Sequence, residues 1–325
     1  MKLIIQIPCL NEEASLPITV ADLPKKIEGI DIIEYLIIND GSTDRTVEVA
    51  REIGVHHVVS FKSNRGLASA FKAGLDACLR LGADIIVNTD ADNQYCGEDI
   101  AKLVAPILEG KSDIVIGERP IADIEHFSVL KKKLQRLGSW AVRVASNSEV
   151  PDAPSGFRAY SRDAAMRLNV VSAYTYTLET IIQAGLNNMA VQSVPIRTNA
   201  MLRKSRLFKS MFSYIRRSIG TIGRIFMLYK PLRTFLWIGF FFIFCGLLIG
   251  LRFLTYQFMG YGSGHIQSLI LAAILFIIGT QSCFIGLLSD LISGNRKILE
   301  DIQYRVKHLD YDIRKPVVEE EEQSE

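Results

Sequence analysis

Residues 84–95, DIIVNTDADNQY, contain the strongest structural signal in this chain. The run from Ile85 to Val87 is short, apolar and β-branched, which is typical of a buried strand. Asp90 and Asp92 follow directly, and two carboxylates at a strand end favour Mg²⁺ or Mn²⁺, because hard cations prefer oxygen ligands and bridge to substrate phosphates. A D-x-D triplet also occurs by chance in solvated loops, so its position after the strand carries the interpretation.

Outward from this stretch, apolar runs alternate with helical segments through the first 120 residues. The runs are LIIQIP (3–8), YLIIND (35–40), HHVVSF (56–61), DIIVNTD (84–90) and DIVIGE (113–118), and segments such as 44–53 and 67–81 separate them. This βαβα order predicts an α/β fold with a mostly parallel sheet. Ligand sites in such sheets lie at the carboxyl ends of the strands, where this chain is polar.

Two of these polar strand ends have structural as well as functional interpretations. Asp40 begins the stretch DGSTD (40–44), and its carboxylate can accept hydrogen bonds from a base or a ribose. The alternative is a strand-to-helix turn in which Gly41 relieves the backbone and a hydroxyl caps the helix. Asn11 and Glu12 follow the first strand, and ordinary capping by Asn11 is the alternative there.

The second half of the chain is apolar and basic. No Asp or Glu occurs between residues 180 and 289, while residues 197–233 contain ten Lys or Arg. Nucleic acid or an anionic membrane surface could attract this charge, and the long apolar segments that follow favour the membrane. Residues 207–226 have apolar side chains at three- and four-residue steps, which predicts an amphipathic interfacial helix or, alternatively, a helix packed on the globular domain.

Residues 234–254 and 266–289 are long and apolar enough to span a bilayer. The link between them has no Lys or Arg, whereas basic residues flank the pair on both outer sides, so both flanks are expected in the cytoplasm. The expected domains are a catalytic domain (1–200), a basic amphipathic juxtamembrane segment (201–233), two transmembrane helices (234–254, 266–289) and a cytoplasmic tail (290–325) with a disordered acidic end.

The remaining segments bear less on function. Residues 121–150 are predicted to form a basic helical connection. Residues 152–162 contain Pro and Gly and are predicted to form a loop that could fold over a ligand. The five cysteines are scattered, with no CxxC pair or His/Cys cluster, so neither a disulfide framework nor a zinc site is predicted. The apolar stretch at the N-terminus is too short for a signal-peptide core, and the first domain is expected to stay in the cytoplasm.

Six features together resemble the family-two GT-A glycosyltransferases of the dolichol-phosphate mannose synthase type. They are IPCLNEE, NDGSTD, NTDADNQY, IGERP, SGFRAYSR and the terminal pair of apolar segments. The resemblance covers nearly the whole chain and implies a GT-A fold with a Rossmann-like sheet. By position, the resemblance implies four groups of site residues. The nucleoside would be cradled by Pro8, Asn11, Glu12 and Asp40, and the metal and diphosphate would be bound by Asp90, Asp92 and Gln94. The acceptor phosphate would be met by Arg119, Arg136 and Ser155, and the donor phosphates by Arg203 and Arg206.

The resemblance also implies a reaction. One sugar passes with inversion from a nucleotide sugar, UDP favoured over GDP, to undecaprenyl or dolichyl phosphate at the cytoplasmic face of the plasma (inner) membrane. The product would be a lipid-linked sugar donor for cell-envelope or protein glycosylation, and relatives suggest a dimer or tetramer. The QxxRW motif of processive relatives is absent, so one sugar per turnover is expected, and residues 155–157 (SGF) stand where some relatives carry GDF with a proposed base.

Other functions fit the sequence less well. A catalytically degenerate membrane scaffold that recruits a transferase or flippase is the main alternative, although every strand end keeps the residue type that catalysis needs. A nucleotide-dependent dehydrogenase would need a G-x-G-x-x-G after the first strand, and none is present. A transporter would need a polar path, which two spans with one charge between them do not offer.

Overall fold

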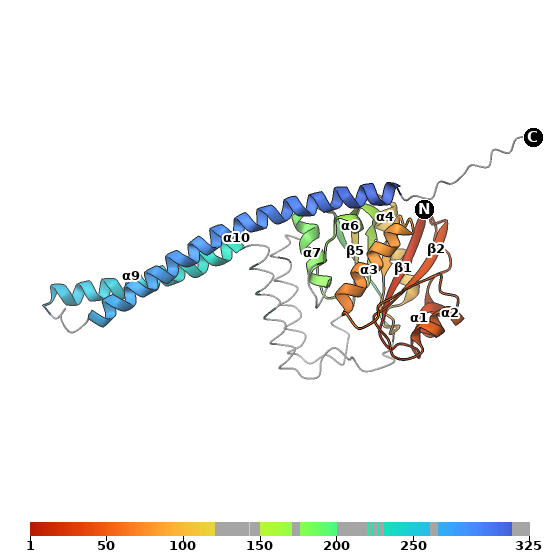
Figure 1. Ribbon diagram of the computed structural model, residues 1–325, viewed down its shortest axis with the longest axis horizontal. Coiled ribbons are helices and arrows are strands. Elements are labelled where there is room, and N and C mark those ends of the chain that lie inside the picture. The colour runs from red at the N-terminus through yellow and green to blue at the C-terminus, as the bar shows by residue number, and fades with distance from the viewer. Residues whose placement is uncertain are drawn as a thin grey trace, which may run out of the picture. The chain divides into compact units, whose positions relative to one another are not determined.

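The computed structural model describes residues 1–120, 143, 150–170, 176–199, 220, 223, 227, 231–260 and 266–313 (Figure 1). The chain forms two compact units. The first contains residues 1–218 and 300–325, and the second contains residues 219–299. The expected amphipathic helix, 207–226, lies almost wholly outside the described residues.

A seven-stranded sheet forms the centre of the first unit. Its strands are β1 (Lys2–Cys9), β2 (Ile32–Asn39), β3 (His57–Ser60), β4 (Ile85–Asn88), β5 (Ile114–Glu118), β6 (Arg158–Ser161) and β7 (Val191–Pro195). The spatial order is β3-β2-β1-β4-β6-β5-β7, and only β6 runs antiparallel to its neighbours. The sequence predictions of five strands and a mostly parallel α/β sheet are therefore confirmed.

Helices of the first unit pack on this sheet. They are α1 (Leu16–Asp22), α2 (Thr46–Glu52), α3 (Leu67–Arg80), α4 (Ile100–Leu108), α6 (Arg162–Arg167) and α7 (Thr177–Leu186), with a short 3₁₀ turn, η1 (Gly97–Asp99). Helix α3 is amphipathic, and it buries Phe71, Leu75 and Cys78 at three- and four-residue steps. Gly74 is required where α3 crosses the sheet, because a Cβ there would lie 2.8 Å from a methyl group of Ile38.

The prediction that residues 152–162 form one loop is wrong in its second half, where β6 lies between β4 and β5. Arg158 made this strand hard to recognise, because a central strand seldom contains a cation. Its side chain is fully buried and donates hydrogen bonds to three backbone carbonyls and one hydroxyl, which satisfies the guanidinium without solvent.

The second unit contains α9 (Pro231–Phe258) and most of α10 (Ile266–Ile313), two helices long and apolar enough to cross a membrane. Glycines bring them close together: a Cβ on Gly239 would lie 2.8 Å from the carbonyl oxygen of Gly279. Helix α10 continues well past the apolar segment predicted at 266–289. The chain therefore has two apolar helices that indicate membrane association, the second with a long polar extension.

Candidate active site

The loops that follow β1 and β2 are joined by hydrogen bonds. Asn11 has a φ of 56°, a left-handed conformation that asparagine tolerates better than most residues. Its backbone N–H donates to Ser42 Oγ at 2.9 Å, and its Oδ1 accepts the backbone N–H of Thr43 at 2.8 Å. Asn11 therefore connects two loops and does not cap a helix, because the N-cap of α1 is Ser15.

Glu12 and Pro8 are buried at the same strand end. Glu12 is 7% exposed, its backbone N–H donates to Thr46 Oγ1 at 2.9 Å, and its Oε2 accepts the hydroxyl of Ser15 at 2.7 Å. Pro8 is a buried residue of β1 itself, in register with Ile38 of β2. Both residues are therefore buried at the carboxyl end of β1.

Asp40 is 5% exposed and is held by the chain that leads into α3. Its Oδ1 accepts the backbone N–H of Arg65 at 2.7 Å, and its Oδ2 accepts that of Gly66 at 2.9 Å. The neighbouring Gly41 has a φ of +73°, and a Cβ there would lie 2.6 Å from the backbone carbon of Ser63. Only glycine fits this close approach, so the turn and the fixed carboxylate depend on each other.

The loop after β4 presents Asp90, Asp92 and Gln94, all half-buried. Asp92 Oδ1 accepts the backbone N–H of Gln94 at 3.2 Å. Asn93 between them has a φ of 53°, and the Thr19 hydroxyl from α1 donates to the backbone carbonyl of Ala91 at 3.0 Å. The two carboxylates and one amide that the sequence singled out thus belong to one ordered turn.

A buried polar network lies beneath Asp90. Gln6 Nε2 donates to Asn88 Oδ1, and Asn88 Nδ2 donates to the carbonyl of Gly156 and to Tyr176 Oη, each at 2.9 Å. A Cβ on Gly156 would lie 3.4 Å from both carboxylate oxygens of Asp90 and 2.9 Å from Tyr176 Oη. The absence of a side chain at Gly156 keeps the space beside the Asp90 carboxylate open.

These residues fit a hard divalent cation. Mg²⁺ is usually bound by one or two carboxylates together with substrate phosphates and water, rather than by an all-protein cage. Asp90 and Asp92 supply the carboxylates, Gln94 supplies an amide oxygen, and Gly156 leaves room. Among the described parts of the chain, no group of three or more His, Cys, Asp or Glu side chains is placed to hold a metal ion.

Arg119, which directly follows β5, forms a bidentate ion pair with Asp152. Nε donates to Oδ2 at 2.7 Å and Nη2 donates to Oδ1 at 3.0 Å, with the Arg119 side chain 12% exposed and that of Asp152 fully buried. Burial acts to lower the pKa of the guanidinium, but Tyr95 and Asp152 outweigh it and raise the pKa above its usual value. Asp152 uses two of the five N–H donors of Arg119.

Ser155 lies in the short loop between Asp152 and β6. Its hydroxyl is fully buried and bonds to no residue that the structure describes. The loop is held from below by Arg158, whose Nε donates to the Ser155 carbonyl at 2.7 Å, and by Tyr95, whose Oη accepts the Gly156 N–H at 3.3 Å. The Ser155 backbone N–H donates to the carbonyl of Asp152 at 3.1 Å, which places this residue next to the partner of Arg119. A buried hydroxyl without a hydrogen bond is unusual in a folded protein, and Tyr160 Oη is the other one among the described residues.

The chain that follows β7 returns to the D-x-D turn. The Asn199 backbone N–H donates to the Gln94 carbonyl at 2.9 Å, and its Nδ2 donates to the carbonyls of Asn93 and Tyr95 at 3.1 and 3.3 Å. Three other predicted site residues, Arg136, Arg203 and Arg206, lie outside the described residues.

Sequence reasoning missed Asp152, Tyr176 and Asn199. Asp152 stood in the predicted Pro/Gly loop, and an acidic residue just before a buried run was a signal that could have drawn attention to it. Tyr176 and Asn199 left no comparable signal, because their roles depend on contacts with Asn88 and Asn93, distant in sequence.

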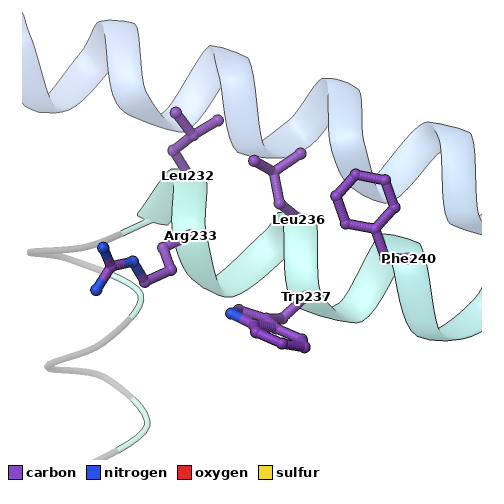
Figure 2. Close-up of a pocket in the computed structure, with 5 residues that line it drawn as sticks. All are labelled: Leu232, Arg233, Leu236, Trp237 and Phe240. Atoms are coloured by element: carbon purple, nitrogen blue, oxygen red, sulfur yellow. The ribbon is translucent and has the colours of Figure 1, made fainter.

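A separate pocket of ≈ 380 Å³ lies on α9, lined by Leu232, Arg233, Leu236, Trp237 and Phe240 (Figure 2). None of the strand-end residues lines it. Arg and Trp at the start of an apolar helix are the residue types found at a membrane–water interface. This pocket is therefore consistent with membrane association.

The profile described as Glycosyl transferase family 2 matches residues 4–168, which include β1, the D-x-D turn, Arg119 and Asp152. The chain belongs to glycosyl transferase family 2. This glycosyltransferase is 31% identical over 214 residues to the UDP-N-acetylglucosamine–dolichyl-phosphate N-acetylglucosaminyltransferase of Methanococcus voltae. The alignment covers 59% of this chain and 83% of the relative.

A second relative of this glycosyltransferase is the polyprenol monophosphomannose synthase of Mycolicibacterium smegmatis, 27% identical over 201 residues, with 58% of this chain and 74% of the relative covered. Among solved structures, glucosyl-3-phosphoglycerate synthase of Mycobacterium tuberculosis in complex with Mn²⁺, UDP and phosphoglyceric acid has a TM-score of 0.53 at 20% identity, covering 68% of this chain and 78% of that one. That likeness confirms the predicted GT-A fold.

Proposed function

We propose that this glycosyltransferase moves a single sugar from a nucleotide sugar, UDP-linked rather than GDP-linked, to a polyprenyl phosphate at the cytoplasmic face of the membrane. The observation that carries the proposal is the pairing of an acidic and a cationic region at one edge of the sheet. Asp90 and Asp92 follow β4, and Arg119 follows β5. Both named relatives act on a polyprenyl or dolichyl phosphate, and two apolar helices indicate membrane association.

We call the loops after β1 and β2 the donor side (Asn11, Glu12, Asp40) and the cluster of Arg119, Asp152 and Ser155 the acceptor side. Asp90, Asp92 and Gln94 would hold Mg²⁺ or Mn²⁺, which when bound neutralises charge on the departing diphosphate. Asp40 would accept hydrogen bonds from the nucleoside. Arg119, kept in place by Asp152, would orient the acceptor phosphate, and Ser155 would donate its orphaned hydroxyl to it.

In this mechanism a phosphate oxygen of the acceptor attacks the anomeric carbon as the bond from that carbon to the diphosphate breaks, with inversion. The phosphate oxygen is already anionic near neutral pH, so no proton has to be removed before attack. A dedicated base is therefore unnecessary, which agrees with Gly156 at the position where some relatives carry an aspartate. An aspartate there would lie against the carboxylate of Asp90.

The test is nucleoside diphosphate release by the purified chain with Mg²⁺ or Mn²⁺, across UDP- and GDP-sugars, with and without polyprenyl phosphate. We expect release that requires both lipid and metal. Asp92→Asn should lower turnover by roughly 10²- to 10³-fold, the usual effect of losing one electrostatic contribution to a transition state. Undiminished turnover in Asp92→Asn would contradict the metal assignment, and no release from any donor by folded protein would favour a scaffold.

A further inference from the structure

The chain that leaves β7 crosses from the end of a neighbouring strand to the D-x-D turn. The Ile196 N–H donates to the carbonyl of Glu118, the last residue of β5, at 3.0 Å. Three residues later, the Asn199 N–H donates to the carbonyl of Gln94 at 2.9 Å. We call residues 196–199 the crossing segment. It connects the end of β5 with the turn that carries the predicted metal ligands.

The crossing segment is held along its length, before its last residue. Ile196 is 5% exposed, and Thr198 forms an isolated antiparallel bridge with Tyr95. The backbone N–H of Arg197 donates to Asp99 Oδ2 at 2.6 Å, and its Nη2 donates to Oδ1 at 2.9 Å. A buried side chain, a strand-like bridge and an ion pair therefore fix the segment, so its last residue meets the turn from a defined position.

Asn199 directs its N–H donors at three consecutive carbonyls of the turn. Its backbone N–H bonds to Gln94, and its Nδ2 donates to the carbonyls of Asn93 and Tyr95 at 3.1 and 3.3 Å. Nδ2 also lies 3.5 Å from Asp22 Oδ2, the longest of these contacts. An asparagine has one backbone and two amide N–H groups, so this residue uses all its donors here. The carbonyls on both sides of Gln94 are therefore bonded to one side chain.

These bonds restrict Gln94, one of the three predicted metal ligands. Its backbone N–H donates to Asp92 Oδ1 at 3.2 Å, and its carbonyl accepts the Asn199 N–H. Its two neighbours, Asn93 and Tyr95, are the residues that the Asn199 amide holds. Loss of a partner that orients a metal ligand commonly lowers metal affinity by roughly 10- to 100-fold. The placement of the Gln94 amide therefore depends on Asn199.

We propose that Asn199 is a positioning residue that holds Gln94 in place to bind the metal ion. It acts through Gln94 rather than on the ion, because its amide nitrogen donates to carbonyls of the turn. The inference rests on the proposed function, since the ion is the one assigned to Asp90, Asp92 and Gln94. It adds to the metal site a residue outside the D-x-D motif, whose amide contacts lie 104 and 106 positions earlier in the chain.

Direct measurement of Mn²⁺ binding tests this role. The full-length chain in detergent is titrated with Mn²⁺ in the presence of UDP, and electron paramagnetic resonance reports the free ion. Asn199→Leu keeps a side chain of similar size and removes the two amide donors, so we expect the Kd for Mn²⁺ to rise about 10-fold. Asn187→Leu is the matched control, because Asn187 is exposed and its side chain has no hydrogen bond to the described residues. Its Kd should equal that of the unmodified chain.

A double variant distinguishes positioning from a general structural effect. Gln94→Ala removes the proposed ligand and should itself raise the Kd for Mn²⁺. When Asn199→Leu is added to Gln94→Ala, we expect a further rise of less than about twofold, because residues that act through one contact are not additive. A general loosening of the fold would instead raise the Kd equally in both backgrounds, so that the two effects multiply.

The outcomes separate this inference from the proposed function. Equal Kd values in Asn199→Leu and Asn187→Leu, or effects of Asn199→Leu and Gln94→Ala that multiply, would overturn the positioning role and leave the proposed function intact. An unchanged Kd in Gln94→Ala would overturn the positioning role as well. Failure of the unmodified chain to bind Mn²⁺ with UDP would overturn both this role and the metal assignment. Thermal unfolding midpoints check folding, and Asn199→Ala with Asn187→Ala replaces the leucine pair if the larger side chain impairs it.

Discussion

On the donor side, most of the hydrogen bonds that hold the loops after β1 and β2 use a backbone group, as in the Asn11–Thr43 and Asp40–Gly66 contacts. On the acceptor side, Arg119 is oriented chiefly by the carboxylate of one buried residue, Asp152. Backbone bonds are shared over many residues, whereas a buried ion pair concentrates its effect in two side chains. The acceptor side is therefore expected to be far more sensitive to single substitutions.

The largest effect is expected from Asp152→Asn. It leaves the buried Arg119 without a charged partner, and breaking a buried pair from one side costs about 3–5 kcal/mol. The thermal unfolding midpoint should fall by roughly 10 °C, given the usual scaling for a domain of this size. Turnover with polyprenyl phosphate should fall with it. Glu52→Gln, which breaks the exposed Arg45–Glu52 pair, is the control and should change stability by less than about 0.5 kcal/mol.

A double variant separates folding from function on the acceptor side. Arg119→Met combined with Asp152→Leu replaces the ion pair by apolar side chains, which is often neutral for stability. The midpoint should return close to that of the unmodified protein, while transfer to the lipid acceptor stays lost. Recovery of transfer together with stability would show that Arg119 does not meet the acceptor.

Gly156→Ala tests the boundary between the two sides. The added Cβ would lie 2.9 Å from Tyr176 Oη and 3.4 Å from both Asp90 oxygens, and overpacking of this kind costs about 1–3 kcal/mol. We expect turnover to fall about 10-fold and the Mn²⁺ concentration for half-maximal activity to rise. Gly250→Ala, where an added Cβ meets nothing within 4 Å, is the matched control. Unchanged metal dependence would argue against Asp90 as a ligand.

The donor side was predictable from sequence because its signals are local. Asn11 and Asp40 each come just after a mostly apolar run, and the sheet topology brings such strand ends to one edge. The acceptor side was only partly predictable. Arg119 follows a strand in the same way, but its partner Asp152 is 33 residues away, and buried ion pairs leave no periodic pattern.

Two structural elements were missed for related physical reasons. The strand β6 contains Arg158, and a charged residue normally indicates a surface position, so the local pattern indicated a loop. The extension of α10 was predicted only as a tail, because its apolar residues follow a heptad rather than an uninterrupted run.

Asp40→Asn should have a smaller effect, on the donor side. The amide oxygen of the new asparagine can accept one of the two backbone N–H groups, but its NH₂ group faces the other N–H. That second backbone N–H is left without an acceptor, and an unsatisfied buried donor costs about 1–3 kcal/mol. We expect a KM for the nucleotide sugar raised several-fold, with KM for the lipid unchanged. Asp31→Asn, just before the same strand and largely exposed, is the control. A rise in the KM for the lipid instead would contradict the assignment of Asp40 to the donor side.

The smallest effect is expected at Asp99, which holds the segment leading to Asn199. Burial acts to raise the pKa of Asp99, but hydrogen bonds from Arg197 and Lys102 outweigh it and lower the pKa to about 2. A lowered carboxyl pKa stabilises the fold above the ordinary value near 4 and loses that contribution as the pH falls toward 2.

Asp99→Asn should therefore cost roughly 1 kcal/mol at neutral pH, a figure kept low because Arg197 is 57% exposed and solvent screens the pair. The cost should shrink between pH 4 and pH 2, as thermal unfolding across that range would show. Glu98→Gln offers a matched comparison, since Glu98 bonds to the same arginine but is 74% exposed. Equal destabilisation by Glu98→Gln and Asp99→Asn would show that burial does not distinguish the two carboxylates. It would also weaken the expectation that Asp152→Asn, at a buried carboxylate, has the largest effect.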